Sequence, residues 1–136
     1  MGFEKFGRKS FTAQTKSAAF VDFLEQGELR ATQCRNCSQI YFPPRADCAA
    51  CLSNDMEWVK IEGTGEIISY TTANYAPTGF EKDVPYTLAL VDFGKVKVFG
   101  RMGGGVPEDA LKVGLPVKAE VVKFPDGQLS YEFLPA

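Results

Sequence analysis

All four cysteines of this chain lie in one short stretch, as Cys34-x-x-Cys37 and Cys48-x-x-Cys51. A Cys-x-x-Cys turn aims two sulfurs at one point, and two facing turns form a tetrahedral thiolate cage suited to Zn²⁺. Because four thiolates leave no open coordination position, we expect a structural metal rather than a catalytic one. A segment this small cannot bury enough apolar surface to fold alone. Metal binding would supply the missing free energy, on the order of 10 kcal/mol or more.

Two other uses of the four cysteines stay open. They could form disulfides, although no secretory signal precedes them and paired Cys-x-x-Cys is the metal arrangement. They could hold iron, as in rubredoxin, because a tetrahedral four-sulfur cage accepts either metal. Zinc is the prediction that we favour.

Composition narrows the function classes. A chain of 136 residues is long enough for one modest domain besides the metal segment. Its formal net charge of −2 argues against a nucleic-acid backbone as the main partner, which usually needs a basic field. No apolar run approaches membrane-spanning length. With reduced, metal-bound cysteines and no signal peptide, we expect a cytoplasmic protein.

The chain contains no histidine, and the cage would use every cysteine. The commonest general base and the strongest side-chain nucleophile near neutral pH are therefore both missing. Catalysis through Ser, Lys, Asp or Tyr stays possible, but no familiar constellation of them appears. An enzyme acting alone is the less favoured interpretation.

The N-terminal part predicts an arm and one helix. Three phenylalanines precede Gln14, so this arm is either a frayed terminus or a segment that docks on a partner: Phe3, Phe6 and Phe11. Apolar residues at three-to-four spacing predict a helix from Thr15 to Gln26, with Thr15 or Ser17 as N-cap and Gly27 at its end. Its apolar face must pack on its own domain or on a partner.

The rest of the chain predicts strands. The segment 28–33 leads into the cysteines as a short strand, and 61–72 is expected to be a long strand whose two glycines suggest a bulge or a sharp bend. After a loop over 73–85, later strands are expected at these ranges: 86–93, 95–101, 117–124 and 128–134. One helical turn is expected over 107–112. Five strands with a helical turn before the fourth fit an OB-type Greek-key barrel.

We therefore predict a mainly β protein with an N-terminal helix, a zinc ribbon and a five-stranded OB-fold barrel. The predicted parts are an arm and helix over 1–30, the ribbon over 31–56 and the barrel over 57–136.

Several landmarks occur together in this order. They are Phe23-x-x-x-Gly27-x-Leu29, the two cysteine pairs, Phe42-Pro43-Pro44-Arg45, Trp58, Gly63-x-Gly65, Ser69-Tyr70-Thr71, Pro85-Tyr86 to Val91, and Gly114-x-Pro116-Val117. From about Phe20 to the C-terminus, the chain resembles a family with an N-terminal helix, a rubredoxin-like zinc ribbon and an OB-fold. That family is associated with acyl-CoA metabolism. Two departures, Ser38 and Leu52, stand where the turn after a cysteine pair favours glycine.

The resemblance implies an accessory subunit. Similar proteins bind thiolase-like partners, as in the small subunit of benzoylsuccinyl-CoA thiolase, and others pair with hotdog-fold enoyl-CoA hydratases. The leading hypothesis is a non-catalytic subunit of an acyl-CoA thiolase complex that helps to shape the acyl-CoA entrance. Arg45, beside two prolines, would then meet a CoA phosphate or simply face solvent.

A hypothesis of another class is single-stranded nucleic-acid binding, which OB-folds often perform. Five aromatic residues could stack on bases or could simply pack within the barrel and its loops: Tyr70, Tyr75, Phe80, Tyr86 and Phe99.

Overall fold

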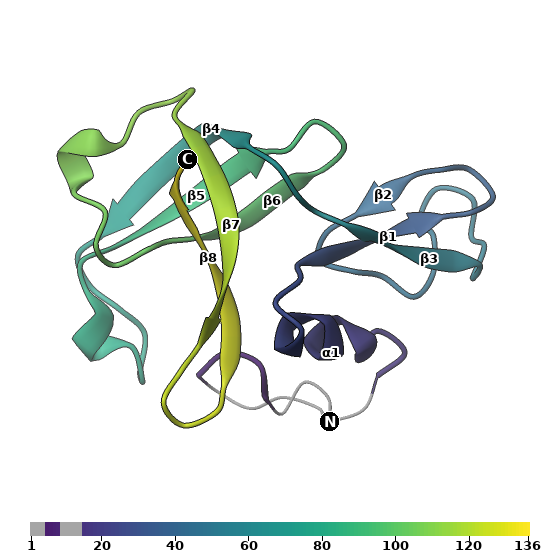
Figure 1. The fold of residues 1–136 in the computed structure, drawn as a ribbon, viewed down its shortest axis with the longest axis horizontal. Coiled ribbons are helices and arrows are strands. Elements are labelled where there is room, and N and C mark those ends of the chain that lie inside the picture. The colour runs from purple at the N-terminus through teal and green to yellow at the C-terminus, as the bar shows by residue number, and fades with distance from the viewer. Residues whose placement is uncertain (1–4, 9–14) are drawn as a thin grey trace. The chain divides into compact units, whose positions relative to one another are not determined.

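The computed structural model describes residues 5–8 and 15–136 (Figure 1). It divides into two compact units. The first contains the described residues up to Glu62 together with Val121–Ser130, and the second contains Gly63–Glu120 with Tyr131–Ala136. The first unit carries the helix and the cysteines, and the second carries most of a β-barrel.

Helix α1 spans Ala19–Glu25 and is shorter than the predicted helix. The predicted N-cap is wrong, because the capping position is Ala18, which has no side-chain acceptor. The hydroxyl of Thr15 instead accepts a hydrogen bond from the backbone N–H of Ser17 at 2.9 Å. Thr15 therefore closes a turn before the helix and is not available to cap it.

The C-terminal end of α1 is as predicted. Gly27 has a φ of +82°, which glycine adopts without steric cost. The N–H of Glu28 donates to the carbonyl of Phe23 at 2.9 Å, and the N–H of Gly27 donates to that of Leu24 at 2.9 Å. These two bonds form a Schellman motif, which satisfies carbonyls that the helix end would otherwise leave free.

The apolar face of α1 packs within its own unit. Its buried residues are Phe20, Val21 and Leu24. The Phe23 ring lies 5.3 Å from the Trp58 ring, and the guanidinium of Arg30 lies 4.3 Å from the centre of the Phe23 ring. Own-domain packing, one of the two alternatives for this helix, is what the structure shows.

The described part of the N-terminal arm also packs on this unit. The Phe6 ring lies 5.7 Å from that of Phe20, and the Gly7 N–H donates to the carbonyl of Leu129 at 2.6 Å. Phe6 is therefore not frayed. The other two arm phenylalanines, Phe3 and Phe11, lie outside the described residues.

The cysteine segment forms a three-stranded antiparallel sheet, in the order β2-β1-β3 (Figure 1). Its strands are β1 (Arg30–Cys34), β2 (Ile40–Tyr41) and β3 (Met56–Lys60). Trp58 of β3 pairs with Thr32 of β1. The sheet thus joins residues before, between and after the cysteine pairs.

The remaining strands form a closed five-stranded barrel in the order β4-β5-β6-β8-β7 (Figure 1). They are β4 (Gly65–Ala73), β5 (Tyr86–Asp92), β6 (Lys97–Met102), β7 (Pro116–Lys123) and β8 (Leu129–Pro135). The parallel β6–β8 pair closes the barrel. A 3-10 turn, η3 (Glu108–Ala110), precedes β7 as predicted, whereas η2 (Glu81–Asp83) lies in the predicted loop. The predicted fold class is confirmed.

Of the two alternatives predicted for Gly63 and Gly65, a bend occurs at Gly63, which has a φ of +84°, and the bulge lies elsewhere. The register of β4 against β5 shifts between Ile67 and Ser69, not at Gly63 or Gly65. Gly65 serves close packing instead, because a Cβ there would lie 2.6 Å from Cγ1 of Val91. Gly65 is therefore required by close packing and not by the bulge.

Among the described residues, we find no helix with the length and apolarity needed to cross a membrane.

Gly100 of β6 lies where the barrel leaves no room for a side chain. A Cβ there would be 2.7 Å from Cε2 of Tyr131 and 2.9 Å from Cε2 of Phe133, which is fully buried. We expect Gly100→Ala to lower the free energy of unfolding by about 1–3 kcal/mol through overpacking. Urea denaturation measures this. The control Gly104→Ala, with open space around its Cβ, should change stability by less than about 0.5 kcal/mol; equal effects would contradict the packing argument.

Candidate metal centre

The two cysteine pairs converge on one point. The Sγ atoms of Cys34, Cys37, Cys48 and Cys51 all lie within 4.8 Å of one another. The Cys34–Cys51 sulfurs are 3.6 Å apart and the Cys37–Cys48 sulfurs 3.5 Å apart. A tetrahedron with metal–sulfur bonds of about 2.3 Å has sulfur–sulfur edges of about 3.8 Å. The four sulfurs are thus positioned to bind a metal ion.

These distances do not fit disulfides. A disulfide needs sulfurs about 2.05 Å apart, and all four cysteines are free. The disulfide alternative is therefore not what the structure shows.

The two cysteine pairs lie on separate backbone turns of the same type. The N–H of Ser38 donates to the carbonyl of Cys34 at 2.8 Å, and the N–H of Leu52 donates to that of Cys48 at 3.0 Å. Ser38 and Leu52 both have positive φ, +67° and +64°. These are the positions where glycine would relieve the turn, so the departures at these two residues change the strain of the turns but not their geometry.

Tyr41 of β2 reaches the sulfurs from between the two pairs. Its hydroxyl lies 3.3 Å from Sγ of Cys48 and accepts hydrogen bonds from the N–H groups of Ala49 at 3.0 Å and Ala50 at 3.2 Å. The bond with Tyr41 lowers the pKa of the Cys48 thiol to about 6 and raises the pKa of Tyr41 itself. Tyr41 therefore stabilises the thiolate that a metal requires.

Asn36 makes a similar contact with another sulfur. Its side-chain amide donates to Sγ of Cys51 at 3.4 Å, and this bond lowers the pKa of Cys51. Sequence reasoning missed both Asn36 and Tyr41 as donors. Their only signal was a polar residue inside one Cys-x-x-Cys turn and a tyrosine between the two turns.

The pKa of the Cys37 thiol is shifted in the opposite direction, upward. A hydrogen bond from the backbone of Gln39 acts to lower its pKa, but hydrogen bonds with Cys48 and the other cysteines outweigh it and raise the pKa to about 12. Four neighbouring thiols share their protons as one system, so the last proton is hard to remove. A bound cation would displace it, which makes metal affinity fall with falling pH.

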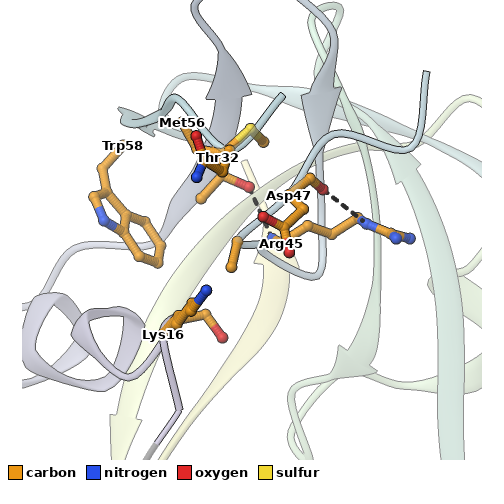
Figure 2. A pocket seen from close by; sticks show the side chains of 9 residues that line it. Lys16, Thr32, Arg45, Asp47, Met56 and Trp58 are labelled. Atoms are coloured by element: carbon orange, nitrogen blue, oxygen red, sulfur yellow. Dashed lines mark hydrogen bonds between the residues drawn. The ribbon is translucent and has the colours of Figure 1, made fainter. Parts of the chain in front are cut away.

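A pocket of about 290 Å³ lies in the same unit as the cage (Figure 2). Figure 2 shows the Trp58 indole on one side, Arg45 and Asp47 on the other, and the Lys16 amine pointing inward. The N–H of Arg45 donates to the hydroxyl of Thr32 at 2.8 Å, and its Nε donates to the carbonyl of Asp47 at 3.4 Å. Arg45 is thus fixed by the cysteine segment and stands at the rim of a pocket with a second cation.

Two of the five aromatic residues considered for base stacking are mostly exposed. Tyr75 exposes 87% of its surface and Phe99 exposes 57%. The Tyr70 hydroxyl donates to the carbonyl of Leu111 at 3.2 Å, and the guanidinium of Arg101 lies 5.1 Å from the centre of the Tyr86 ring. Phe80 is half-buried. Tyr70, Tyr75 and Phe99 are thus the exposed members of the five, and the nucleic-acid hypothesis stays a prediction.

Two family models match consecutive parts of the chain. Residues 21–57 match the rubredoxin-like zinc ribbon domain of ChsH2, and residues 58–122 match its C-terminal OB-fold domain. The chain is also 32% identical over 96 residues to a DUF35 domain-containing scaffold protein of Pyrococcus furiosus, covering 71% of this chain and 70% of that protein.

Other relatives carry different names. A DUF35 domain-containing scaffold protein of Methanocaldococcus jannaschii is 32% identical, covering 67% of this chain and 65% of that protein. A probable enoyl-CoA hydratase alpha subunit of Thermomonospora curvata is 30% identical, covering 74% of this chain. This chain spans only 31% of that subunit's length.

The fold recurs in a solved structure. A chain of the structure named "Ltp2-ChsH2(DUF35) aldolase" superposes with a TM-score of 0.77 at 25% identity, covering 92% of this chain and 98% of that chain. The cysteine cage, the ribbon sheet and the barrel all agree with these matches. The chain therefore belongs to the DUF35 family of ChsH2-type proteins, in which a rubredoxin-like zinc ribbon precedes an OB-fold domain.

Proposed function

We propose that this chain is a non-catalytic, zinc-binding subunit of an acyl-CoA thiolase complex. The observation that carries the proposal is the convergence of all four cysteines on one point in a chain without histidine. A thiolase needs a reactive cysteine, and a metal-bound cage would leave this chain without a free cysteine as well as without a histidine. The partner would supply the chemistry, and this chain would supply a shaped surface.

The names of the relatives are consistent with a non-catalytic scaffold role. Three of the similar archaeal proteins are named scaffold proteins. The thiolase partner itself rests on the family resemblance, since none of the relatives described above is named a thiolase.

A hydratase is the second candidate partner. Two relatives are named hydratase alpha subunits: the Thermomonospora curvata protein and the 3-oxo-4,17-pregnadiene-20-carboxyl-CoA hydratase alpha subunit of Mycobacterium tuberculosis. This chain spans 31% and 36% of their lengths, so the proposal of a hydratase partner rests on the matched part alone.

Coexpression distinguishes these partners. We expect the chain to co-elute with a thiolase from the same organism in size-exclusion chromatography and to raise its activity above that of the thiolase alone. An acyl-CoA dehydrogenase serves as the unrelated control and should elute separately. Co-elution with a hydratase alone would contradict the thiolase assignment and retain the scaffold role, whereas a chain that elutes alone and changes neither activity would contradict both.

We propose zinc as the resident metal, held by the four cysteines. The sulfur spacing fits a four-thiolate tetrahedron, and such a closed site is typical of structural zinc. Elemental analysis of the purified chain should find one zinc per chain, and Cys48→Ser should lose it. A stoichiometric iron content would contradict the choice of zinc, and a metal-free wild-type chain with four alkylatable thiols would contradict the cage itself.

We also propose that Arg45 contacts a phosphate of CoA in the assembled complex. Lys16 on the same pocket adds a second positive charge, and the terminal guanidinium N–H groups of Arg45 have no hydrogen-bond acceptor among the described residues. A charge-assisted hydrogen bond contributes about 1.5–3 kcal/mol.

Arg45→Gln should therefore weaken acyl-CoA binding by the complex about 10-fold or more, as measured by KM or calorimetry. The matched control is an acyl-pantetheine substrate, which lacks the nucleotide phosphates and should bind both forms equally. Equal loss with both substrates would instead indicate that Arg45 acts through the fold of the pocket.

A further inference from the structure

The hydrogen bonds around the Tyr41 hydroxyl fix where its proton points. A phenol oxygen has one proton to donate and can accept from other donors. The N–H groups of Ala49 and Ala50 both donate to it, at 3.0 and 3.2 Å. The remaining partner is Sγ of Cys48 at 3.3 Å, which has no proton of its own when it ligates a metal. Tyr41 must therefore donate to this sulfur.

The second side-chain donor reaches the same cysteine pair. Asn36 lies in the first Cys-x-x-Cys turn, but its amide donates across the cage to Sγ of Cys51. Both sulfurs of the second pair thus receive a side-chain hydrogen bond. Within residues 5–8 and 15–136, the sulfurs of Cys34 and Cys37 meet no such donor besides the other cysteines.

Exposure distinguishes Cys37 from the other three cysteines. Cys48 is buried and Cys51 is half-buried, whereas Cys37 of the first pair is exposed and Cys34 is buried. The Arg45 guanidinium lies 5.4 Å from the centre of the Tyr41 ring, which places a cation beside the residue that donates to Cys48. Four thiolates around a divalent cation carry an excess of two negative charges. Donors that share this charge stabilise the bound state and make the sulfur less nucleophilic.

We propose that Tyr41 and Asn36 are positioning residues that hold the second cysteine pair on the metal, so that metal loss and attack by electrophiles begin at Cys37 of the first pair. This inference rests on the metal binding proposed above, so metal content is measured first in every variant. A wild-type chain without metal would count against the proposed cage, whereas the outcomes below decide between the two pairs.

The first test removes each hydrogen-bond donor but keeps a side chain of similar shape. Tyr41→Phe keeps the ring, and Asn36→Asp keeps the side-chain size while replacing the donor by a negative acceptor. With cobalt(II) in the cage, we expect either change to speed metal transfer to a chelator about 10- to 100-fold. It should also move the sulfur-to-cobalt charge-transfer band to longer wavelength, since a less stabilised thiolate gives up charge more easily.

Tyr70→Phe is the matched control, because its hydroxyl donates to a backbone carbonyl outside the cage, that of Leu111. It should leave the band and the transfer rate unchanged. A purely structural role for Tyr41 would lower stability without moving the band. If Tyr41→Phe folds poorly, Asn36→Asp alone decides, since Asn36 is exposed. If both variants have the same charge-transfer band and the same metal-transfer rate as the wild type, the proposal is overturned.

The second test locates the first sulfur to react. Addition of a limiting amount of N-ethylmaleimide to the metal-loaded chain forms one carbon–sulfur bond at the maleimide double bond, and the adjacent carbon takes a proton from solvent. Peptide mapping should find Cys37 modified first, several-fold ahead of Cys48 and Cys51. First modification of a cysteine of the second pair, or equal modification of all four, would overturn the assignment.

Discussion

The convergence of four sulfurs is the constraint on which the ribbon depends. Its sheet consists of two five-residue strands and one two-residue strand, which bury little apolar surface by themselves. The sulfurs bring together the turn after β1 and the turn before β3. One metal ion would therefore cross-link these two turns and stabilise a segment whose strands are too short to do so alone.

The helix and the ribbon stabilise each other through aromatic contacts. Phe20 lies 5.9 Å from Phe42, a residue between the cysteine pairs, and Phe23 lies against Trp58 of β3. Thr32, the buried polar residue of β1, accepts the N–H of Arg45 and so joins the segment after Phe42 to the sheet. A surface offered to a partner enzyme would thus be held by the metal on one side and by aromatic packing on the other.

Much of this fold could be predicted because its turns have strong local signals. Gly27 has the positive φ that its predicted role at the helix end requires, and residue composition with turn signals predicted the five barrel strands. The N-cap could not be predicted, because Thr15 and Ser17 satisfy each other before the helix begins. The bulge was placed at the glycines, but tertiary packing against Val91 fixes Gly65 and leaves the bulge to Ile67 and Ser69.

The metal site, like the fold, has features that local sequence patterns predict and features that only tertiary contacts determine. The spacing of the cysteines predicted that they meet, because a Cys-x-x-Cys turn is local. The donors Tyr41 and Asn36 act across the ribbon, and nothing in their spacing states which sulfur they reach. The exposed fraction of each cysteine, and hence the difference between the two pairs, also arises only when the ribbon folds.

Amide hydrogen exchange, with the metal bound and after its removal by a chelator at neutral pH, measures whether the metal holds the ribbon together. We expect the amides of β1, β2 and β3 to lose their protection when the metal is removed. Those of β5 and β6 in the barrel should keep theirs, because that unit has its own core. Unchanged protection of the ribbon strands without metal would contradict the claim that the sulfur cage holds this part of the chain together.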